Sequence, residues 1–136
     1  MLIAGFACDD FSLMNNHRKT LEEKGESGDT FHAIIEYLRN FKPALVVLEN
    51  ICNAPWLDEK LAGNKRTKKG RDKQTGIDRH LESVGYRTVF CRVDSKNFYV
   101  PHTRQRGYML AVRADRISDD EMKSKAMVFE KVFRSL

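Results

Sequence analysis

The sequence predicts an α/β protein with a partial Rossmann-like sheet of about four strands, mostly parallel, and flanking helices. Two short, nearly unbroken apolar runs, LIAGFA at 2–7 and ALVVLEN at 44–50, are typical of strands covered on both faces. The segment between them carries apolar residues at helical spacing. A strand, a helix and a second strand in this order favour parallel strands joined by a right-handed crossover. The length of 136 residues, 41% of them hydrophobic, suits one modest core.

The first helix is expected between the two runs, because apolar residues repeat there every three or four positions. Asp29 is suitably placed to cap the start of this helix, and Pro43 prevents its continuation. The apolar positions are Phe31, Ile34, Ile35, Leu38 and Phe41.

The alternation of helix and strand continues in the second half of the chain. A second helix is indicated by Ile77, Leu81 and Val84 and is closed by Gly85. It leads into TVFCRV at 88–93, which has the composition of a strand.

A last strand is expected at YMLAVR, residues 108–113. The sequence SDDE at 118–121 then has the spacing of a capping box, in which the first and fourth residues satisfy backbone amides at a helix start. The helix that it opens would carry Met122, Ala126, Phe129 and Phe133.

Charge and cysteine usage restrict the possible partners and compartment. The formal net charge is +5, with much of the excess in NKRTKKGRDK at 64–73, which favours a polyanionic partner. Cys8, Cys52 and Cys91 are too few and too widely spaced for a disulfide framework or a paired zinc site, so we expect a reducing, intracellular location and no metal. No apolar run approaches the ~20 residues that cross a bilayer, so no membrane partner is expected.

Polar residues that stand at strand ends are the first functional candidates. Cys8 follows the first apolar run, and Glu49 and Asn50 end the second. Parallel strands joined by one crossover are often neighbours about 5 Å apart, so these groups are expected to share the crevice outside the carboxyl ends of the strands. A carboxylate and an amide at the end of a buried strand are costly unless they reach water, a hydrogen-bond partner or a substrate.

Three segments, GFACDDFS, VVLENICNAPW and YVPHTRQRGY, resemble the catalytic motifs of cytosine-5 DNA methyltransferases in order and spacing. The resemblance includes GDTF at 28–31 and the Gly85–Tyr86 turn, and it covers nearly all of residues 2–113. It implies that residues 1–114 form the C-terminal half of a class I methyltransferase-like catalytic domain, followed by a helical extension at 115–136. The divergence of the motifs is similar to that of eukaryotic, in particular fungal, members.

The resemblance also implies a role for each matching residue. Cys8 would be the nucleophile, Glu49 would hydrogen-bond the ring nitrogen of the flipped cytosine, and Asn50 would fix the strand end. Arg106 would reach the exocyclic oxygen of the base or its phosphate, while Arg104 would hold the DNA backbone. The remaining candidate DNA-binding residues are Ser12 of the loop and, from their charge, Lys65, Arg66, Lys68 and Lys69. A solvated loop and a nuclear import signal are the alternatives for this basic run. The implied partner is DNA, and the implied location is the nucleus.

Several positions depart from the family pattern. Ala7 replaces a proline, and Asp9 and His102 replace glutamines. A carboxylate beside the cysteine would disfavour the thiolate.

The implied cofactor is S-adenosyl-L-methionine, but its glycine-rich turn between a strand and a helix is not recognisable, and cofactor-binding residues are not assigned. KGESGD at 24–29 has two glycines but follows charged residues instead of a strand. We therefore expect that the 136 residues alone neither bind the cofactor nor methylate DNA. A truncated gene model, a degenerate copy and a split enzyme all explain this, and the partners would include a missing cofactor-binding half or a second copy at an exposed sheet edge.

Two other functions stay open. One is a DNA-binding remnant without catalysis, and the other is an unrelated cysteine hydrolase, which would need a histidine on Cys8. His17, His32 and His80 are expected at the surface, and Cys52, Cys91 and Trp56 are expected to be packing residues.

Overall fold

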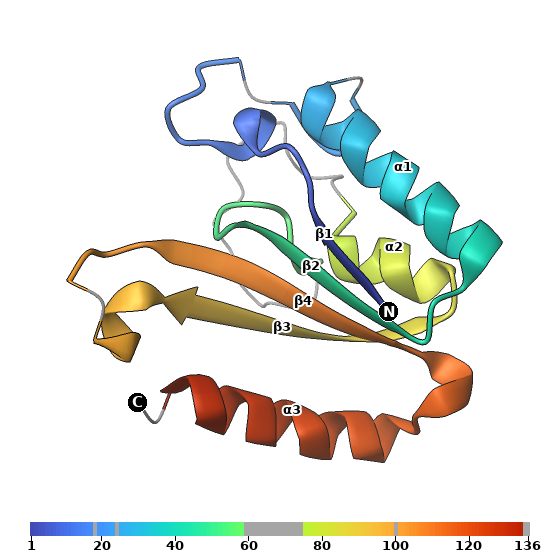
Figure 1. The fold of residues 1–136 in the computed structure, drawn as a ribbon. Coiled ribbons are helices and arrows are strands. Elements are labelled where there is room, and N and C mark those ends of the chain that lie inside the picture. The colour runs from blue at the N-terminus through green and yellow to red at the C-terminus, as the bar shows by residue number, and fades with distance from the viewer. Residues whose placement is uncertain (18, 24, 59–74, 100, 135–136) are drawn as a thin grey trace.

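The computed structural model describes residues 1–17, 19–23, 25–58, 75–99 and 101–134. Its centre is a four-stranded sheet with the order β1-β2-β4-β3 (Figure 1). The predicted α/β class and the number of strands are therefore confirmed. The strands are β1 (Leu2–Gly5), β2 (Leu45–Ile51), β3 (Tyr86–Asp94) and β4 (Gln105–Arg113).

The expectation that the sheet is mostly parallel is wrong in detail. Only β1 and β2 pair in parallel, whereas β4 pairs antiparallel with both β2 and β3. The connection from β3 to β4, residues 95–104, holds a single short helical turn, Ser95–Phe98. A parallel crossover needs a dozen or more residues, so this connection can only reverse the chain. β4 lies between β2 and β3, so β2 and β3 run in the same direction but are not neighbours.

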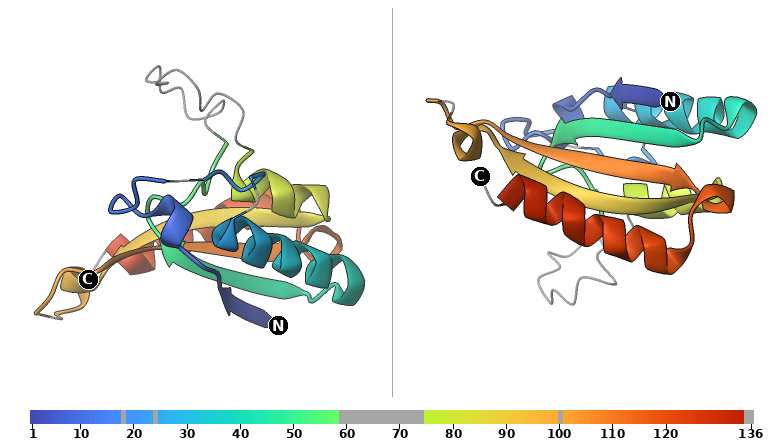
Figure 2. Two further views of the ribbon diagram at one scale, coloured as in Figure 1. Left: turned by 90° about the horizontal axis from the view of Figure 1, so that it is seen from above. Right: turned by 60° about the horizontal axis from the view of Figure 1, so that its bottom comes forward.

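Within the described ranges, three helices cover the two faces of the sheet. Helices α1 (Glu26–Phe41) and α2 (Ile77–Ser83) lie on one face, and α3 (Asp119–Arg134) lies on the other (Figures 1 and 2). The core is on the α1 and α2 side, where alternate strand residues are fully buried against the two helices. Its fully inaccessible side chains are Val46, Leu48, Met109 and Ala111 of the sheet, Phe31 and Leu38 of α1, and Ile77 and Leu81 of α2.

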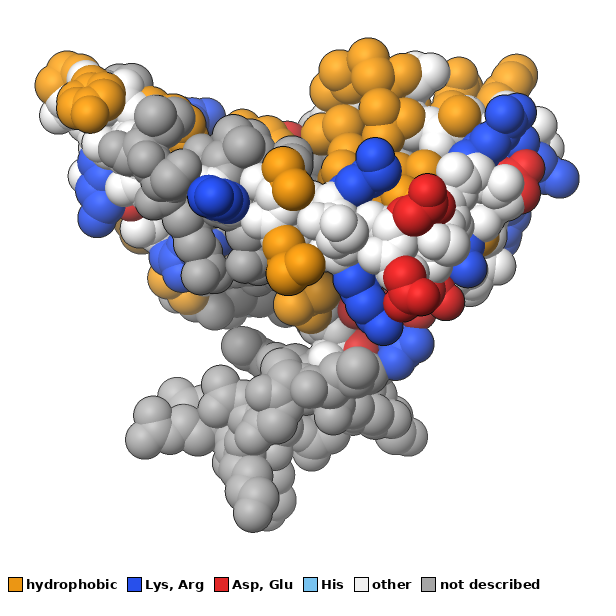
Figure 3. Space-filling model, turned by 90° about the horizontal axis from the view of Figure 1, so that it is seen from below, with side chains coloured by type: hydrophobic (Ala, Val, Ile, Leu, Met, Phe, Trp, Pro, Cys, Tyr) orange, Lys and Arg blue, Asp and Glu red, His pale blue; other side chains and the backbone are white. Residues whose placement is uncertain are grey.

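The opposite face of the sheet is covered less completely, which corrects the expectation of strands buried on both faces. Every second residue of β2 is only half-buried, and Ile3 of β1 is 67% exposed. Helix α3 packs mainly on β3, at the far margin of the sheet. The view from the α3 side accordingly shows hydrophobic side chains gathered on part of the surface (Figure 3).

The ends of α1 show one wrong prediction and one correct one. The helix begins at Glu26, and Gly25, not Asp29, is the N-cap. Asp10, from the loop after β1, instead accepts a hydrogen bond from the Ser27 backbone N–H at 3.0 Å, so the cap is supplied by a distant segment. At the other end the helix stops at Phe41, before Pro43, as expected.

The other helix boundaries agree with the sequence. Gly85 has φ +90°, the left-handed conformation that favours glycine after a helix. Ser118 and Glu121 form the capping box: the Glu121 N–H donates to Ser118 Oγ at 3.2 Å, and the Ser118 N–H donates to Glu121 Oε2 at 3.0 Å. Among the described residues, no helix has the length and apolar character to span a membrane.

Candidate active site

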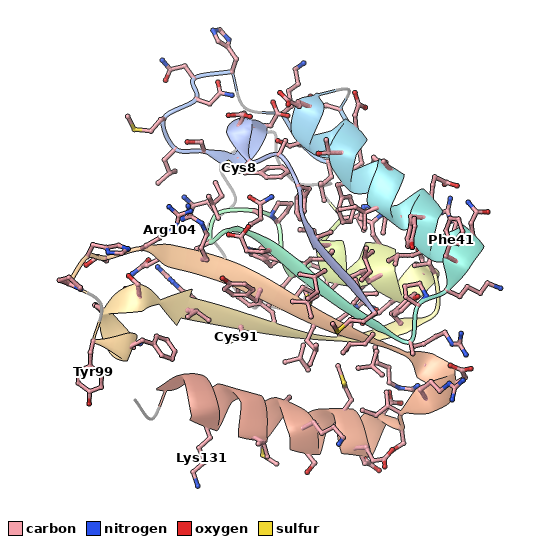
Figure 4. All side chains as sticks on the ribbon, viewed as in Figure 1. Cys8, Phe41, Cys91, Tyr99, Arg104 and Lys131 are labelled. Atoms are coloured by element: carbon pink, nitrogen blue, oxygen red, sulfur yellow. The ribbon has the colours of Figure 1, made fainter. Side chains whose placement is uncertain are left out.

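The carboxyl ends of β1 and β2 meet at one end of the sheet. The strands pair with Gly5 opposite Glu49, and Cys8 follows shortly after β1. Figure 4 shows Cys8 at this end of the sheet together with Arg104, which immediately precedes β4. A methyl group at Gly5 would lie 3.3 Å from Oε2 of Glu49, so the carboxylate lies close to the β1 backbone. The segment with the thiol and the strand with the carboxylate are thus side by side.

Asn50 connects these two segments directly. Its side-chain N–H₂ donates to the carbonyl oxygens of Phe6 at 3.0 Å and Ala7 at 3.4 Å, while its Oδ1 accepts from the Ile51 N–H at 2.7 Å. The side chain is 2% exposed, so the hydrogen bonds offset the cost of burying the amide. The residue beside Glu49 therefore holds the backbone that leads into Cys8.

Glu49 is paired with a residue from a third segment. Arg106, near the start of β4, places its Nε 3.1 Å from Oε1 of Glu49, and its Nη1 donates to the Gln105 carbonyl at 2.8 Å. Both side chains of the pair are partly exposed, so the pair orients the carboxylate more than it stabilises the fold. Arg106 had been expected on the base or its phosphate, and in the structure it contacts the carboxylate.

The loop that carries Cys8 is anchored on both sides of the thiol. Before it, the Ala7 N–H donates to Thr30 Oγ1 at 3.2 Å, and after it, the Asp10 N–H donates to Ser27 Oγ at 3.2 Å. The Asp10 carboxylate is 8% exposed at the N-terminus of α1, where negative charge is favourable. These anchors were not assigned from the sequence. The sequence offered one indication of them: the segments GDTF and CDDFS belong to the resemblance. The resemblance gives no role to Ser27, Thr30 or Asp10.

Two further candidates lie near the loop and the β4 hairpin. Ser12 ends the short helical turn Asp9–Phe11, and its Oγ accepts from the Met14 N–H at 3.2 Å. Arg104 is exposed, and its backbone N–H donates to Ser95 Oγ at 2.9 Å. The four basic candidates at 65, 66, 68 and 69 lie outside the described residues.

A second cysteine lies close to the arginines. Cys52 follows β2 and is half-buried, and burial raises its pKa, although the charges of Arg92 and Arg106 lower it. A raised pKa keeps this thiol protonated near neutral pH, which fits the packing role that was expected for it.

Cys91 and Trp56 are buried, as predicted. The Trp56 Nε1–H donates to the Ile51 carbonyl at 3.0 Å, and its ring stacks on Phe90 with centroids 5.4 Å apart. A methyl group at Gly107 would lie 2.3 Å from the indole nitrogen, so this strand position requires glycine. Trp56 is therefore a packing residue between β2 and β4.

The histidines are placed less simply than expected. His32 is exposed, but its Nε2 lies 3.0 Å from the Leu21 carbonyl oxygen. His80 is half-buried, and the rings of His32 and His80 lie 5.6 Å apart between α1 and α2. Within the described ranges no group of His, Cys, Asp and Glu is arranged to hold a metal ion.

The segment at 24–29 does not fit a cofactor. A methyl group at Gly28 would lie 2.8 Å from the Leu21 carbonyl oxygen, and one at Gly25 would lie 2.6 Å from Asp10 Oδ2. Both glycines therefore pack against the chain itself. A glycine turn that binds S-adenosylmethionine needs its backbone open to the ligand.

Comparison with known proteins identifies the family. The sequence model of the family of C-5 cytosine-specific DNA methylases matches residues 1–134. The DNA (cytosine-5-)-methyltransferase DMT5 of Cryptococcus neoformans is 36% identical over 120 residues, which are 88% of this chain and 4% of that protein. The orphan methyltransferase M.SPRI of Bacillus phage SPR is 31% identical over 121 residues, 89% of this chain and 24% of that protein.

A solved structure agrees on the fold. The Dnmt2 methyltransferase of S. pombe superposes with a TM-score of 0.50 at 20% identity, covering 83% of this chain and 30% of that one. The chain spans a quarter or less of the length of these two methyltransferases, DMT5 and M.SPRI. The motifs, the match over residues 1–134 and this fold lead to one conclusion: the chain belongs to the C-5 cytosine-specific DNA methylase family.

Proposed function

We propose that this chain provides the cytosine-binding and nucleophilic part of a DNA cytosine-5 methyltransferase. The observation that carries the proposal is the parallel pairing of β1 and β2, with Gly5 opposite Glu49 and the Asn50 amide bonded to the carbonyls of Phe6 and Ala7. This pairing brings the segment with the only cysteine of the loop beside a carboxylate. A thiol and a carboxylate are the two groups that addition to a cytosine ring requires.

Cys8 activates the base by covalent addition. Its thiolate forms a bond to C6, and the π electrons of the C5–C6 bond move toward C5 and the ring, which makes C5 nucleophilic. The Glu49 carboxyl group, carrying a proton, donates a hydrogen bond to N3, and this proton neutralises the electron density that addition places on the ring. After substitution at C5, a proton leaves C5, the double bond forms again and the thiolate departs. The base must first leave the stack, because the thiol cannot reach C6 inside a duplex.

Arg106 holds Glu49 in place for this step. At 3.1 Å from Oε1, the guanidinium fixes the carboxylate at the strand end. A rigid donor is better suited than lysine to keep a carboxylate in one orientation, so Arg106→Lys should slow addition while the fold persists.

Members of this family take the methyl group from S-adenosyl-L-methionine. Gly25 and Gly28 are packed against the chain, so the segment around them does not offer its backbone to this cofactor. We therefore expect the 136-residue chain alone to show no cofactor binding in calorimetry and no methylation of DNA; micromolar binding would contradict this.

DNA is the proposed partner, and the nucleus is the proposed location. Arg104 is exposed beside the site, and Ser12 lies in the loop after Cys8. Lys65, Arg66, Lys68 and Lys69 are proposed phosphate contacts because cations at these positions would release counterions from DNA.

Isotope exchange at C5 tests the proposal without any cofactor. Addition at C6 followed by solvent protonation and elimination replaces the hydrogen at C5, so DNA tritiated at C5 should release tritium to water. We expect release with the native chain, none with Cys8→Ser and a loss of about 10²-fold or more with Glu49→Gln. Cys91→Ser is the matched control, because Cys91 lies on β3 and takes no part in the site. Release that survives Cys8→Ser would refute Cys8 as the nucleophile.

The second candidate function is DNA binding without catalysis. The departures from the family pattern beside Cys8, where Ala7 replaces a proline and Asp9 replaces a glutamine, favour it. In that case the native chain should bind DNA with a steep salt dependence but release no tritium.

A further inference from the structure

The turn between β3 and β4 extends beyond the rest of the sheet in all the ribbon views (Figures 1 and 2). It lies at the end of the sheet where Cys8 and Arg104 are found, and Tyr99 stands at its outer part (Figure 4). The side chain of Tyr99 is 90% exposed. The ring is therefore free to stack on a partner molecule.

The backbone of Tyr99 makes its position more informative. Its φ is +58°, in the left-handed region, which a residue with a Cβ disfavours and glycine tolerates. Tyr99 follows the helical turn Ser95–Phe98, where glycine would be the favoured residue. Burial of the ring does not offset this backbone conformation, so a contact outside the chain is a candidate role for Tyr99.

Hydrogen bonds make the base of the turn rigid. Ser95 accepts from the Arg104 N–H at 2.9 Å through its Oγ, and it donates from its own N–H to the Arg104 carbonyl at 3.1 Å. The Ser95 Oγ also donates to the His102 carbonyl at 2.5 Å. At the other side, Asp94 accepts from the Lys96 N–H at 3.2 Å. Tyr99 is therefore presented from a fixed frame.

The charge around Tyr99 identifies the chemistry of the partner. Residues 92–106 contain four Lys or Arg residues and His102, but Asp94 is their single carboxylate. Lys96 and Arg104 are exposed on either side of Tyr99 in the sequence. The Lys96 Nζ lies 3.6 Å from Oδ2 of Asp94, and because the lysine of this pair is exposed, phosphate can replace the carboxylate as its partner. Exposed aromatic rings between cations are the usual means by which proteins hold unstacked nucleic-acid bases and their phosphates.

We propose that the β3–β4 turn is a second DNA-binding element, in which Tyr99 stacks on an unpaired base and Lys96 and Arg104 contact the flanking phosphates. This rests on the proposed function for the identity of the nucleic acid. Enzymes that act on a flipped base leave a gap in the stack and separate its neighbours. A rigid aromatic ring at the same end of the sheet as Cys8 suits one of those neighbouring bases.

Binding of a labelled, mixed-sequence oligonucleotide of about 20 nucleotides tests this proposal, in single-stranded and duplex form. All variants are made in the Cys8→Ser background, so that covalent chemistry does not contribute. We expect Tyr99→Ala to weaken single-strand binding about tenfold without changing the salt dependence, and Tyr99→Phe to bind as the parent does. Lys96→Ala and Arg104→Ala should each reduce the slope of the logarithm of the binding constant against the logarithm of salt concentration by about one.

Tyr99→Gly separates binding from folding. Glycine relieves the left-handed backbone, so the melting temperature should stay the same or rise while the affinity falls as in Tyr99→Ala. Phe41→Ala is the matched control: Phe41 is 69% exposed but lies at the opposite end of the sheet, and it should bind normally (Figure 4).

Several outcomes would overturn the inference: no DNA binding by the parent, full affinity of Tyr99→Ala, or an equal loss in Phe41→Ala. These outcomes are separate from the catalytic proposal. Tyrosine-dependent binding without tritium release from the native chain would refute only the catalytic function, and tritium release with a dispensable Tyr99 would refute only this inference.

Discussion

Asn50 shows how one amide can link fold and site. It donates to two carbonyl oxygens of the segment that leads to Cys8 and accepts from its own neighbour, at 2% exposure. The sequence assigned it a role at the strand end, but not the contacts with Phe6 and Ala7, which are more than forty positions away. Contacts at such a separation depend on which strands pair, and local sequence does not fix this.

We expect Asn50→Leu to destabilise the chain by about 1–3 kcal/mol, because it leaves two carbonyl groups without their donor. Urea unfolding followed by circular dichroism measures this loss. Asn53→Ala, at an exposed position of the following turn, is the control and should change stability little. Equal stability of Asn50→Leu and the native chain would show that water replaces the amide.

His80 gives a prediction at the same scale for pH. Its Nε2 is buried and has no hydrogen-bond partner among the described residues, with Oε1 of Glu22 3.9 Å away. Burial, followed by the nearby His32, lowers the pKa of His80 below 6.5, against the opposing charges of Glu22 and Asp78. Unfolded His80 therefore binds more protons than folded His80 as the pH falls below about 6.5. Its contribution to stability is complete above that pH and is lost progressively below it.

Replacing His80 should remove this dependence. Urea unfolding at pH 7.5 and 5.5 should show a smaller loss of stability for His80→Gln than for the native chain, by less than one proton's slope since the ring is partly exposed. His17→Gln, at an exposed position, is the control: between pH 7.5 and 5.5 its free energy of unfolding should fall as much as that of the native chain. An unchanged slope in His80→Gln would mean that His80 is not the group involved.

At the scale of elements, α1 and the Cys8 loop depend on each other. No side chain of the helix caps its N-terminus. Instead, the Asp10 carboxylate in the loop accepts a hydrogen bond from the Ser27 N–H, and Ser27 Oγ accepts one from the Asp10 N–H. Gly25 makes this possible, because a methyl group there would lie 2.6 Å from Asp10 Oδ2. These two reciprocal hydrogen bonds take the place of the cap that the sequence predicts at Asp29.

Asp10→Ala should cost about 1 kcal/mol, as loss of a helix cap does, and it should also slow tritium release because the loop after Cys8 is no longer held. The paired measurements are urea unfolding and the exchange assay. Asp29→Ala is the control; it lies within the first turns of α1 without a side-chain cap role and should affect exchange little. If Asp10→Ala is destabilised but releases tritium at the native rate, Asp10 stabilises the fold without holding the Cys8 loop in its active arrangement.

The order of the strands also belongs to this scale. Apolar runs and helical spacing predicted four strands and three helices in the right places, because periodicity is a local property. They did not predict that β4 enters between β2 and β3. The short turn after β3 reverses the chain, and this is what brings Arg106 opposite Ile51 and beside Glu49.

For the whole molecule, the notable feature is the uneven covering of the sheet. β1 pairs only with β2 among the described strands, and Ile3 is 67% exposed on it. An exposed apolar edge strand offers its backbone groups to another chain. We expect the 136-residue chain to associate in a concentration-dependent manner.

Ile3→Lys should reduce this association, because a charge on an edge strand opposes strand pairing. Analytical ultracentrifugation measures the effect, with Met14→Lys, at another exposed position outside the sheet, as the control. If the native chain is monomeric at all concentrations, the edge strand β1 does not pair with a second copy.

The sequence by itself determined the class of fold and the elements and predicted which residues react, because periodicity, capping and the motifs around Cys8, Glu49 and Arg106 are all read within a few positions. The tertiary structure alone decided which of these residues meet: Asn50 with the carbonyls before Cys8, Arg106 with Glu49, Asp10 with α1, and Tyr99 with solvent. The physical reason is that pairing across the sheet is a long-range choice. It is set by the packing of one face of the sheet against α1 and α2 and by the length of a single turn, and no local pattern specifies either.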